Sequence, residues 1–243
     1  FKAKPRSGTR REAVEEEEDG SNLPQKLDGV PDSLRAWWAR IEPTELERVT
    51  LRSGRCDVLA HLAKLLKRDR KILDLGCGPG LLAKEAARRD IIGVDMTASM
   101  VRAARQWMDV VLPDSFLEHF PSEQMDAVVL CNVLEPYSPD VRRLLFSHTL
   151  EFLGPTGRVV VVIAVKAGPG CASEGGMDLV FPTAIEGAAS PEVIEEEMTL
   201  AGLDVSKIEL VECRTVDHTR ALPGQEPRVE RRGFAVVIGK RAA

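Results

Sequence analysis

Short runs of consecutive apolar residues alternate along this chain with stretches in which apolar residues recur every three or four positions. The first pattern is typical of buried strands and the second of amphipathic helices. We predict strands at residues 72–75, 91–95, 110–112, 125–132, 159–165, 205–216 and 233–239. Helices are predicted between them at residues 81–89, 97–107, 140–152 and 191–201.

The order of these elements predicts the fold class. Strands that alternate with helices form parallel sheets, and the uninterrupted apolar run 159–165 suits a central strand of such a sheet. The last two strands are joined by the polar loop 219–232 and have no helix between them. We therefore expect an α/β, Rossmann-like, doubly wound sheet of seven strands, mostly parallel, with an antiparallel terminal hairpin.

The remaining segments complete the domain organisation. Residues 1–25 are highly charged and are expected to form a disordered tail, followed by one domain over 26–243. Residues 26–70 should form helices that lead into the first strand, and Trp37 and Trp38 on them suit either a lid or the core. Residues 167–190 are too long for a bare connector, and we expect them to cover the active site, although a surface insertion with a small packing patch explains them equally well.

A glycine-rich turn follows the first predicted strand. Gly76, Gly78 and Gly80 allow positive φ and let a ligand lie against bare backbone, and the next helix points free N–H groups at the same place. Asp95 ends the second strand, 19 residues after Gly76, where it can accept the hydroxyls of a ribose. The unit predicts a cofactor that contains adenosine.

Asp74 narrows the type of cofactor. Dinucleotide sites usually carry G-x-G-x-x-G, whereas the glycines here follow G-x-G-x-G. A carboxylate two residues before the first glycine would repel a pyrophosphate and would suit a ligand with a cationic group.

The stretch D-L-G-C-G-P-G from Asp74 to Gly80 resembles the first motif of class I S-adenosylmethionine-dependent methyltransferases, and Asp95-Met96 resembles the second. The resemblance implies an enzyme that binds S-adenosylmethionine and releases S-adenosylhomocysteine. It implies that the cofactor contacts this loop, including Cys77, and both motif residues Asp95 and Met96. It also places Asp114, with Ser115 and Phe116 beside it, at the adenine, although a turn after Pro113 explains Asp114 equally well.

The same resemblance locates the methyl acceptor at the exit of the fourth strand, N-V-L-E-P-Y from Asn132 to Tyr137. Asn132 is expected at the cofactor, and the candidate catalytic residues are Glu135, Tyr137 and His218. Many relatives read N-V-L-E-H-V here, so Pro136-Tyr137 removes a familiar histidine. The stretch also differs from the N-P-P-Y of enzymes that methylate amides or bases.

Composition excludes several classes of function. The net charge of −5 makes nucleic acid an unlikely partner, and we interpret the basic cluster Lys64, Lys67, Arg68, Arg70 and Lys71 as a solvated helix end. Five cysteines without C-x-x-C spacing argue against disulfides and a metal site. No apolar run is long enough to span a membrane, so we expect a cytoplasmic protein, although a chain that begins with Phe1 leaves an upstream targeting sequence open.

The preferred hypothesis is methyl transfer to an oxygen or nitrogen atom of a small molecule. A peptide or protein acceptor is the main alternative. An NAD(P)-dependent oxidoreductase and a non-enzymatic scaffold with the same fold are further alternatives.

Overall fold

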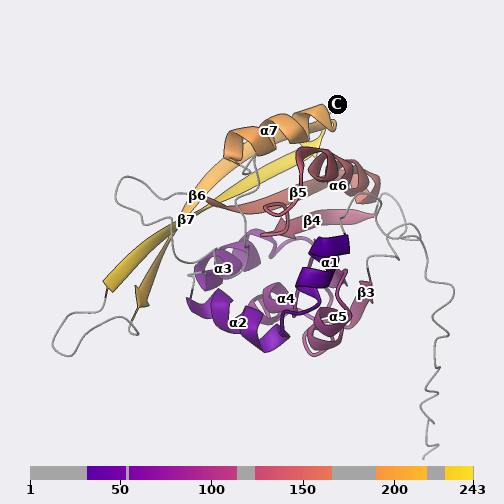
Figure 1. Cartoon of the computed structure of the whole chain (residues 1–243). Helices are drawn as coiled ribbons and strands as arrows, with labels where there is room; N and C mark the ends of the chain where they lie inside the picture. The colour runs from indigo at the N-terminus through magenta and orange to yellow at the C-terminus, as the bar shows by residue number, and fades with distance from the viewer. Residues whose placement is uncertain (1–31, 53–54, 114–123, 166–189, 218–227, 243) are drawn as a thin grey trace, which may run out of the picture.

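A computed structural model describes residues 32–52, 55–113, 124–165, 190–217 and 228–242. Its centre is a seven-stranded sheet in the order β3-β2-β1-β4-β5-β7-β6 (Figure 1). The strands are β1 (Ile72–Leu75), β2 (Ile92–Asp95), β3 (Val110–Pro113), β4 (Met125–Cys131), β5 (Leu153–Val165), β6 (Leu203–Asp217) and β7 (Arg228–Arg241). β1 to β5 pair in parallel, and β7 pairs antiparallel with both β5 and β6. The predicted fold class is confirmed.

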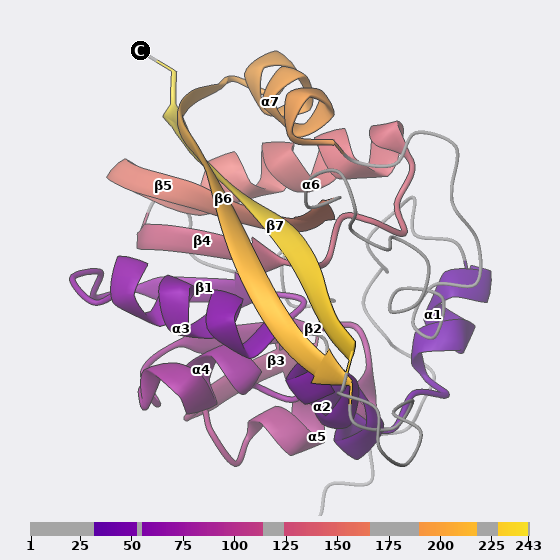
Figure 2. The same ribbon diagram turned by 90° about the vertical axis from the view of Figure 1, so that its left-hand side faces the viewer.

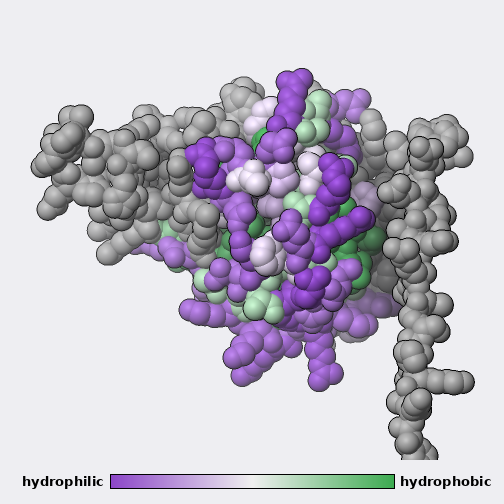
Figure 3. All heavy atoms as spheres, turned by 90° about the horizontal axis from the view of Figure 1, so that it is seen from below, coloured by the Kyte–Doolittle hydropathy of each residue, from purple (hydrophilic) through white to green (hydrophobic). Residues whose placement is uncertain are grey.

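Helices cover both faces of this sheet (Figure 2). They are α1 (Asp32–Trp38), α2 (Pro43–Arg52), α3 (Arg55–Leu65), α4 (Leu81–Ala86), α5 (Ala98–Ala104), α6 (Pro139–Phe152) and α7 (Pro191–Leu200). Seen from below in Figure 3, hydrophilic side chains cover most of the described surface, as expected for amphipathic helices with their polar sides in water. In the described part of the chain, no helix is long and apolar enough to cross a membrane.

The sheet separates two apolar cores. α6 and α7 pack on one face, against β5 residues Val159, Val161 and Ile163. α3, α4 and α5 pack on the other, where Val160 and Val162 of the same strand point. Successive side chains of a strand face opposite ways, so a strand covered by helices on both faces must be apolar at every position. This explains the continuous valine run.

Several predicted element boundaries are wrong. β7 begins at Arg228, so residues 228–232 belong to the strand and not to the predicted loop, because backbone pairing with residues 213–217 extends the hairpin. β5 begins at Leu153 rather than at residue 159, and its first part is irregular, because the register to β4 shifts between Met125 and Ala127. α4 stops at Ala86 rather than at Arg89, because Ala87 adopts a left-handed conformation with φ of 51°.

Candidate functional site

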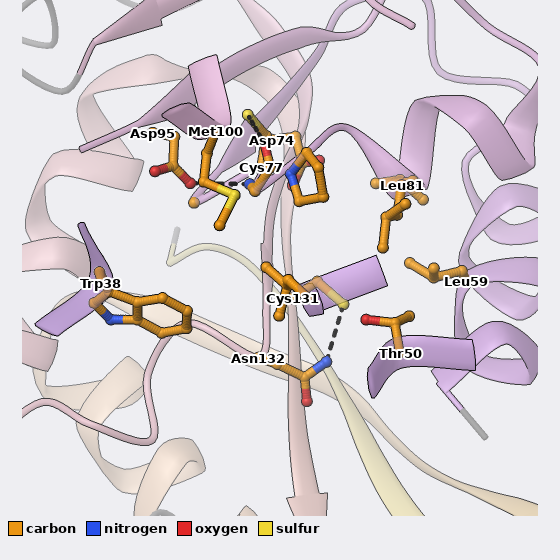
Figure 4. A pocket seen from close by; sticks show the side chains of 15 residues that line it. Trp38, Thr50, Leu59, Asp74, Cys77, Leu81, Asp95, Met100, Cys131 and Asn132 are labelled. Atoms are coloured by element: carbon orange, nitrogen blue, oxygen red, sulfur yellow. Dashed lines mark hydrogen bonds between the residues drawn. The ribbon is translucent and has the colours of Figure 1, made fainter. Parts of the chain in front are cut away.

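A small pocket of about 100 Å³ lies where β1, β2 and β4 end. Ligands of open α/β sheets bind beyond the carboxyl ends of the strands, and this pocket occupies that position. Asp74, Asp95 and Asn132 line it from the strand ends, and Trp38 and Thr50 line it from the N-terminal helices (Figure 4). Its lining includes Trp38, Leu46, Thr50, Asp74, Gly76, Cys77, Gly78, Asp95 and Asn132.

The glycine loop is tied to the neighbouring strands. Gly76 and Gly80 have φ of 73° and 82°, in the region that favours glycine. A Cβ on Gly76 would lie 2.5 Å from Val133 Cγ2, and one on Gly80 would lie 3.1 Å from the Cα of Ala104. The loop therefore needs glycine both for its conformation and for its close contacts with the β4 exit and α5.

Asp95 fixes the far side of the loop through hydrogen bonds to both carboxylate oxygens. The backbone N–H of Gly78 donates to Oδ2 at 2.9 Å. The backbone N–H and the hydroxyl of Thr97 donate to Oδ1 at 2.9 and 2.6 Å. The role of Thr97 was missed from the sequence, although an Asp whose carboxylate binds the N–H two residues later is a recognisable turn pattern.

Asp74 is a buried carboxyl group beside a second one. Its side chain is only 2% exposed, and burial together with the charge of Asp95 raises its pKa to about 7. Burial and the same two carboxylates also raise the pKa of the Cys77 thiol, so Cys77 contributes a neutral wall. The pocket thus concentrates negative charge out of water, which is costly without a compensating cation.

Two polar residues, Asn132 and Glu135, follow the end of β4, and of these Asn132 belongs to the pocket lining while Glu135 does not. Asn132 has a left-handed backbone with φ of 55°, and it lines the pocket. Its Oδ1 is buried and accepts no hydrogen bond from the residues that the structure describes, so it is an acceptor available to a ligand. Glu135 lies half-buried, and its Oε1 accepts a hydrogen bond of 3.2 Å from the backbone N–H of Ala164 on β5.

Helices α1 and α2 close the pocket from the other side. Trp38, Leu46 and Thr50 belong to its lining, and a Cβ on Gly78 would lie 3.4 Å from Leu46 Cδ2. Trp37 meets the ring of Trp38 edge to face, with centroids 5.0 Å apart. The sequence left the tryptophans open between a lid and the core, and Leu46 and Thr50 were not recognised, because periodicity shows an apolar face and not what it covers.

The other predicted site residues lie elsewhere. Tyr137 is 6% exposed and packs in the α6/α7 core, which favours a packing role, and Met96 packs against the same core outside the pocket lining. Asp114, Ser115, Phe116, His218 and the expected covering segment 167–190 fall outside the described residues. Among the residues that are described, no three His, Cys, Asp or Glu side chains are arranged to hold a metal ion.

Comparison with known proteins agrees with this geometry. Residues 72–157, which contain the glycine loop, Asp95 and the β4 exit, match the model of a family described as a methyltransferase domain. The chain resembles the solved magnesium protoporphyrin IX methyltransferase of Synechocystis PCC 6803 with a TM-score of 0.59 and 16% identity. That match covers 87% of this chain and 99% of the other.

Two curated proteins are similar over part of their length. Trans-aconitate 2-methyltransferase of Afipia carboxidovorans is 31% identical over 130 residues, which cover 51% of this chain and 49% of that protein. Magnesium-protoporphyrin O-methyltransferase of Rhodobacter capsulatus is 31% identical over 124 residues, covering 44% and 55%. The chain thus spans about half the length of these two relatives.

Proposed function

Because this chain belongs to the class I S-adenosylmethionine-dependent methyltransferases, we propose that it transfers a methyl group from S-adenosylmethionine to an oxygen or nitrogen atom of a small molecule. The observation that carries the proposal is the pair of buried carboxyl groups, Asp74 and Asp95, on either side of the glycine loop. These groups sit at the ends of adjacent parallel strands, β1 and β2. A ligand with both a cationic group and a ribose complements them.

Asp74 is the proposed partner of the cation. S-Adenosylmethionine carries an ammonium group and a sulfonium group, and either would offset the repulsion between Asp74 and Asp95. An opposite charge nearby favours the ionised carboxylate, so the cofactor should lower the pKa of Asp74 from its value of about 7. A pyrophosphate would have the reverse effect, which is why a dinucleotide fits this pocket less well.

Asp95 is the proposed partner of the ribose. Its Oδ2 faces the glycine loop and accepts a hydrogen bond from the backbone N–H of Gly78, and a carboxylate oxygen can accept more than one hydrogen bond. A ribose hydroxyl at this oxygen would therefore add a contact without displacing the loop. Thr97 holds the other oxygen and fixes the orientation of the carboxylate.

Methyl transfer from a sulfonium is an in-line displacement in which the acceptor attacks the methyl carbon and the thioether leaves with its electron pair. The cofactor is already activated, so the protein mainly orients the acceptor and excludes water. Asn132 at the β4 exit is suited to position a donor group through its buried Oδ1. Glu135 and His218 stay candidate general bases for a hydroxyl acceptor, with Tyr137 a weaker candidate because it is buried.

A small acceptor is supported by the size of the pocket and by the relatives. Trp38, Leu46 and Thr50 lie over the strand ends and help to line a pocket of about 100 Å³. The two curated relatives are named for trans-aconitate and magnesium protoporphyrin, both small molecules. A peptide or protein acceptor is the second candidate.

Calorimetric titration tests the cofactor site with three ligands: S-adenosylhomocysteine, methylthioadenosine and NAD. The first should bind with micromolar affinity, and methylthioadenosine, which lacks the ammonium group, should bind more weakly. Asp74→Asn should reduce the difference between these two ligands, whereas the exposed Asp204→Asn should leave it unchanged. Binding of NAD alone, or of no ligand, would refute the proposal.

The acceptor is best sought by transfer of a tritiated methyl group. Cell extract is incubated with the protein and labelled cofactor and is then separated into protein, RNA and small-molecule fractions. Label in the small-molecule fraction, absent with Asp95→Ala, supports the proposal. Label confined to protein would support the second candidate instead.

A further inference from the structure

A second, larger cavity lies at the amino ends of the parallel strands, on the side of the sheet opposite to the cofactor pocket at their carboxyl ends. It has a volume of about 380 Å³ and is lined by basic side chains from three separate segments. Arg68 and Arg70 come from the connection between α3 and β1, Arg158 from the start of β5, and Lys240 from the end of β7. This edge, where β4 and β5 begin, lies at the left in Figure 2.

The sheet itself forces two of these charges together. Arg158 on β5 is the direct antiparallel partner of Lys240 on β7. Like charges placed directly opposite across a strand pair are destabilising. Asp204 on β6 faces Lys240 from the other side, and Asp69 binds Nη2 of Arg158 at 2.6 Å. The same Nη2 of Arg158 also donates a hydrogen bond to the backbone carbonyl of Leu65, which helps to hold the guanidinium in place.

The acidic groups in the cavity are already engaged. Asp126 accepts hydrogen bonds from the backbone N–H groups of Arg70 and Lys71 at 2.7 and 3.0 Å, which lower its pKa. Asp69 is paired with Arg158. Four basic and two acidic side chains therefore leave an excess of positive charge.

Several side-chain N–H groups that line this positively charged cavity have no acceptor among the described residues. Within the described chain, the side chains of Arg68, Arg70 and Lys240 form no hydrogen bond or ion pair. The Nε of Arg158 is buried and likewise has no acceptor among the described residues. Arginine forks match the oxygen geometry of phosphate, and lysine adds a point charge.

We propose that this cavity is a binding site for a phosphate or pyrophosphate group, separate from the methyl-transfer site. Two members of the basic cluster interpreted from the sequence as a solvated helix end, Arg68 and Arg70, form one wall of this cavity, and Arg158 and Lys240 from distant strands complete it. Chain folding, and not local sequence, assembles the site.

Calorimetry on the full chain tests the site with pyrophosphate and ADP at moderate salt. Pyrophosphate should bind saturably at one site, and ADP should bind with similar affinity, since the phosphate is what is recognised. Arg70→Gln and Lys240→Gln should each weaken pyrophosphate binding by about tenfold, the scale of one charge-assisted hydrogen bond. Arg105→Gln, an exposed arginine on the C-cap of α5, should have no effect.

Asp95→Ala separates this proposal from the proposed cofactor site, because it should weaken S-adenosylhomocysteine binding and leave pyrophosphate binding intact. No saturable binding of pyrophosphate to the unmodified chain would overturn the inference. So would equal weakening by Arg105→Gln, or binding of ADP without pyrophosphate, because the cavity would then not recognise phosphate.

Discussion

Charged side chains are buried at two places in the described chain, and the two are built in opposite ways. At the cofactor pocket, Asp74 and Asp95 bring like charges together. Between α6 and α7, Arg142 and Glu197 form an ion pair whose side chains are 1% and 8% exposed. Arg142 donates to Glu197 from Nε and Nη2 at 2.8 and 2.6 Å, and from Nη1 to the carbonyl of Tyr137 at 2.7 Å.

The difference separates a structural site from a functional one. The Arg142–Glu197 pair satisfies its own charge and hydrogen bonds, so it needs no ligand and ties α7 to the β4 exit. The Asp74–Asp95 pair brings two buried carboxyl groups together, which raises the pKa of Asp74 to about 7, so a cationic ligand would stabilise its ionised form. Strongly perturbed groups in a cleft are candidates for function, whereas a buried pair that is fully matched is a packing element.

The largest effect should come from breaking the matched pair. Arg142→Met should lower the free energy of unfolding by about 3–5 kcal/mol, because Glu197 becomes an uncompensated buried charge. Urea unfolding, followed by tryptophan fluorescence, measures the loss. The double variant Arg142→Met/Glu197→Leu should recover much of it. A double variant as unstable as the single one would show that the bond to the Tyr137 carbonyl, and not the charge, dominates.

The like-charge pair should make stability depend on pH. The pKa of Asp74 is about 7 in the folded protein, against an ordinary value of 3.8. The folded state binds more protons than the unfolded state between these values, so stability falls as the pH rises from about 4 to about 7. Each pKa unit corresponds to about 1.4 kcal/mol, so the loss in the free energy of unfolding approaches roughly 4 kcal/mol at about pH 8. In Asp74→Asn, this loss of unfolding free energy with rising pH should be absent, which urea unfolding between about pH 4 and about pH 8 measures.

Cofactor binding should change with pH in the other direction. An ionised Asp74 is needed opposite a cation, so affinity for S-adenosylhomocysteine should fall by up to about tenfold per unit as the pH drops below about 7. Stability and affinity that rise together with pH would contradict the assignment of Asp74.

Removing the other carboxylate should have a smaller effect on binding. Asp95→Ala should weaken binding of S-adenosylhomocysteine by about 1.5–3 kcal/mol, the range for hydrogen bonds to a charged group. Asp204→Ala is the matched exposed control for calorimetry. Unchanged affinity in Asp95→Ala would mean that the ribose binds elsewhere.

The smallest effect should come from an exposed pair. Lys84 of α4 binds Glu47 of α2 at 2.6 Å, with both side chains more than a third exposed, and its Nζ lies 4.8 Å from the Trp107 ring centroid. Glu47→Gln should cost less than about 1 kcal/mol of stability and should matter less at high salt. A larger loss in urea unfolding would show that α2 is held over the pocket mainly by this contact.

Local patterns predicted the parts of the site that lie close together in sequence. Asp74, the glycines and Asp95 fall within one βαβ unit, so spacing alone placed them side by side. The family prediction is confirmed by the match over residues 72–157, which includes this unit. The roof formed by Leu46 and Thr50 depends on how α2 packs across the strand ends, and no pattern within α2 specifies that.

Pairings over long sequence distances were not predictable. Arg142 and Glu197 are 55 residues apart, and Arg158 reaches Lys240 only because β7 enters the sheet beside β5. The strand boundary at Arg228 was missed for the same reason, since a polar stretch becomes strand when a partner strand pairs with it. Tyr137 was expected at the acceptor but lies in the core, because the chain turns from the β4 exit into α6 there.

The position of β7 between β5 and β6 also sets the order in which the strands of the sheet can pair during folding. During synthesis, β6 leaves the ribosome first and has no strand to pair with, because its only neighbour in the described sheet is the later β7. The parallel half of the sheet can assemble while the chain is still being made, but the antiparallel half must wait. Such late, long-range pairing is slow, so the nascent chain exposes a strand edge that chaperones would need to shield.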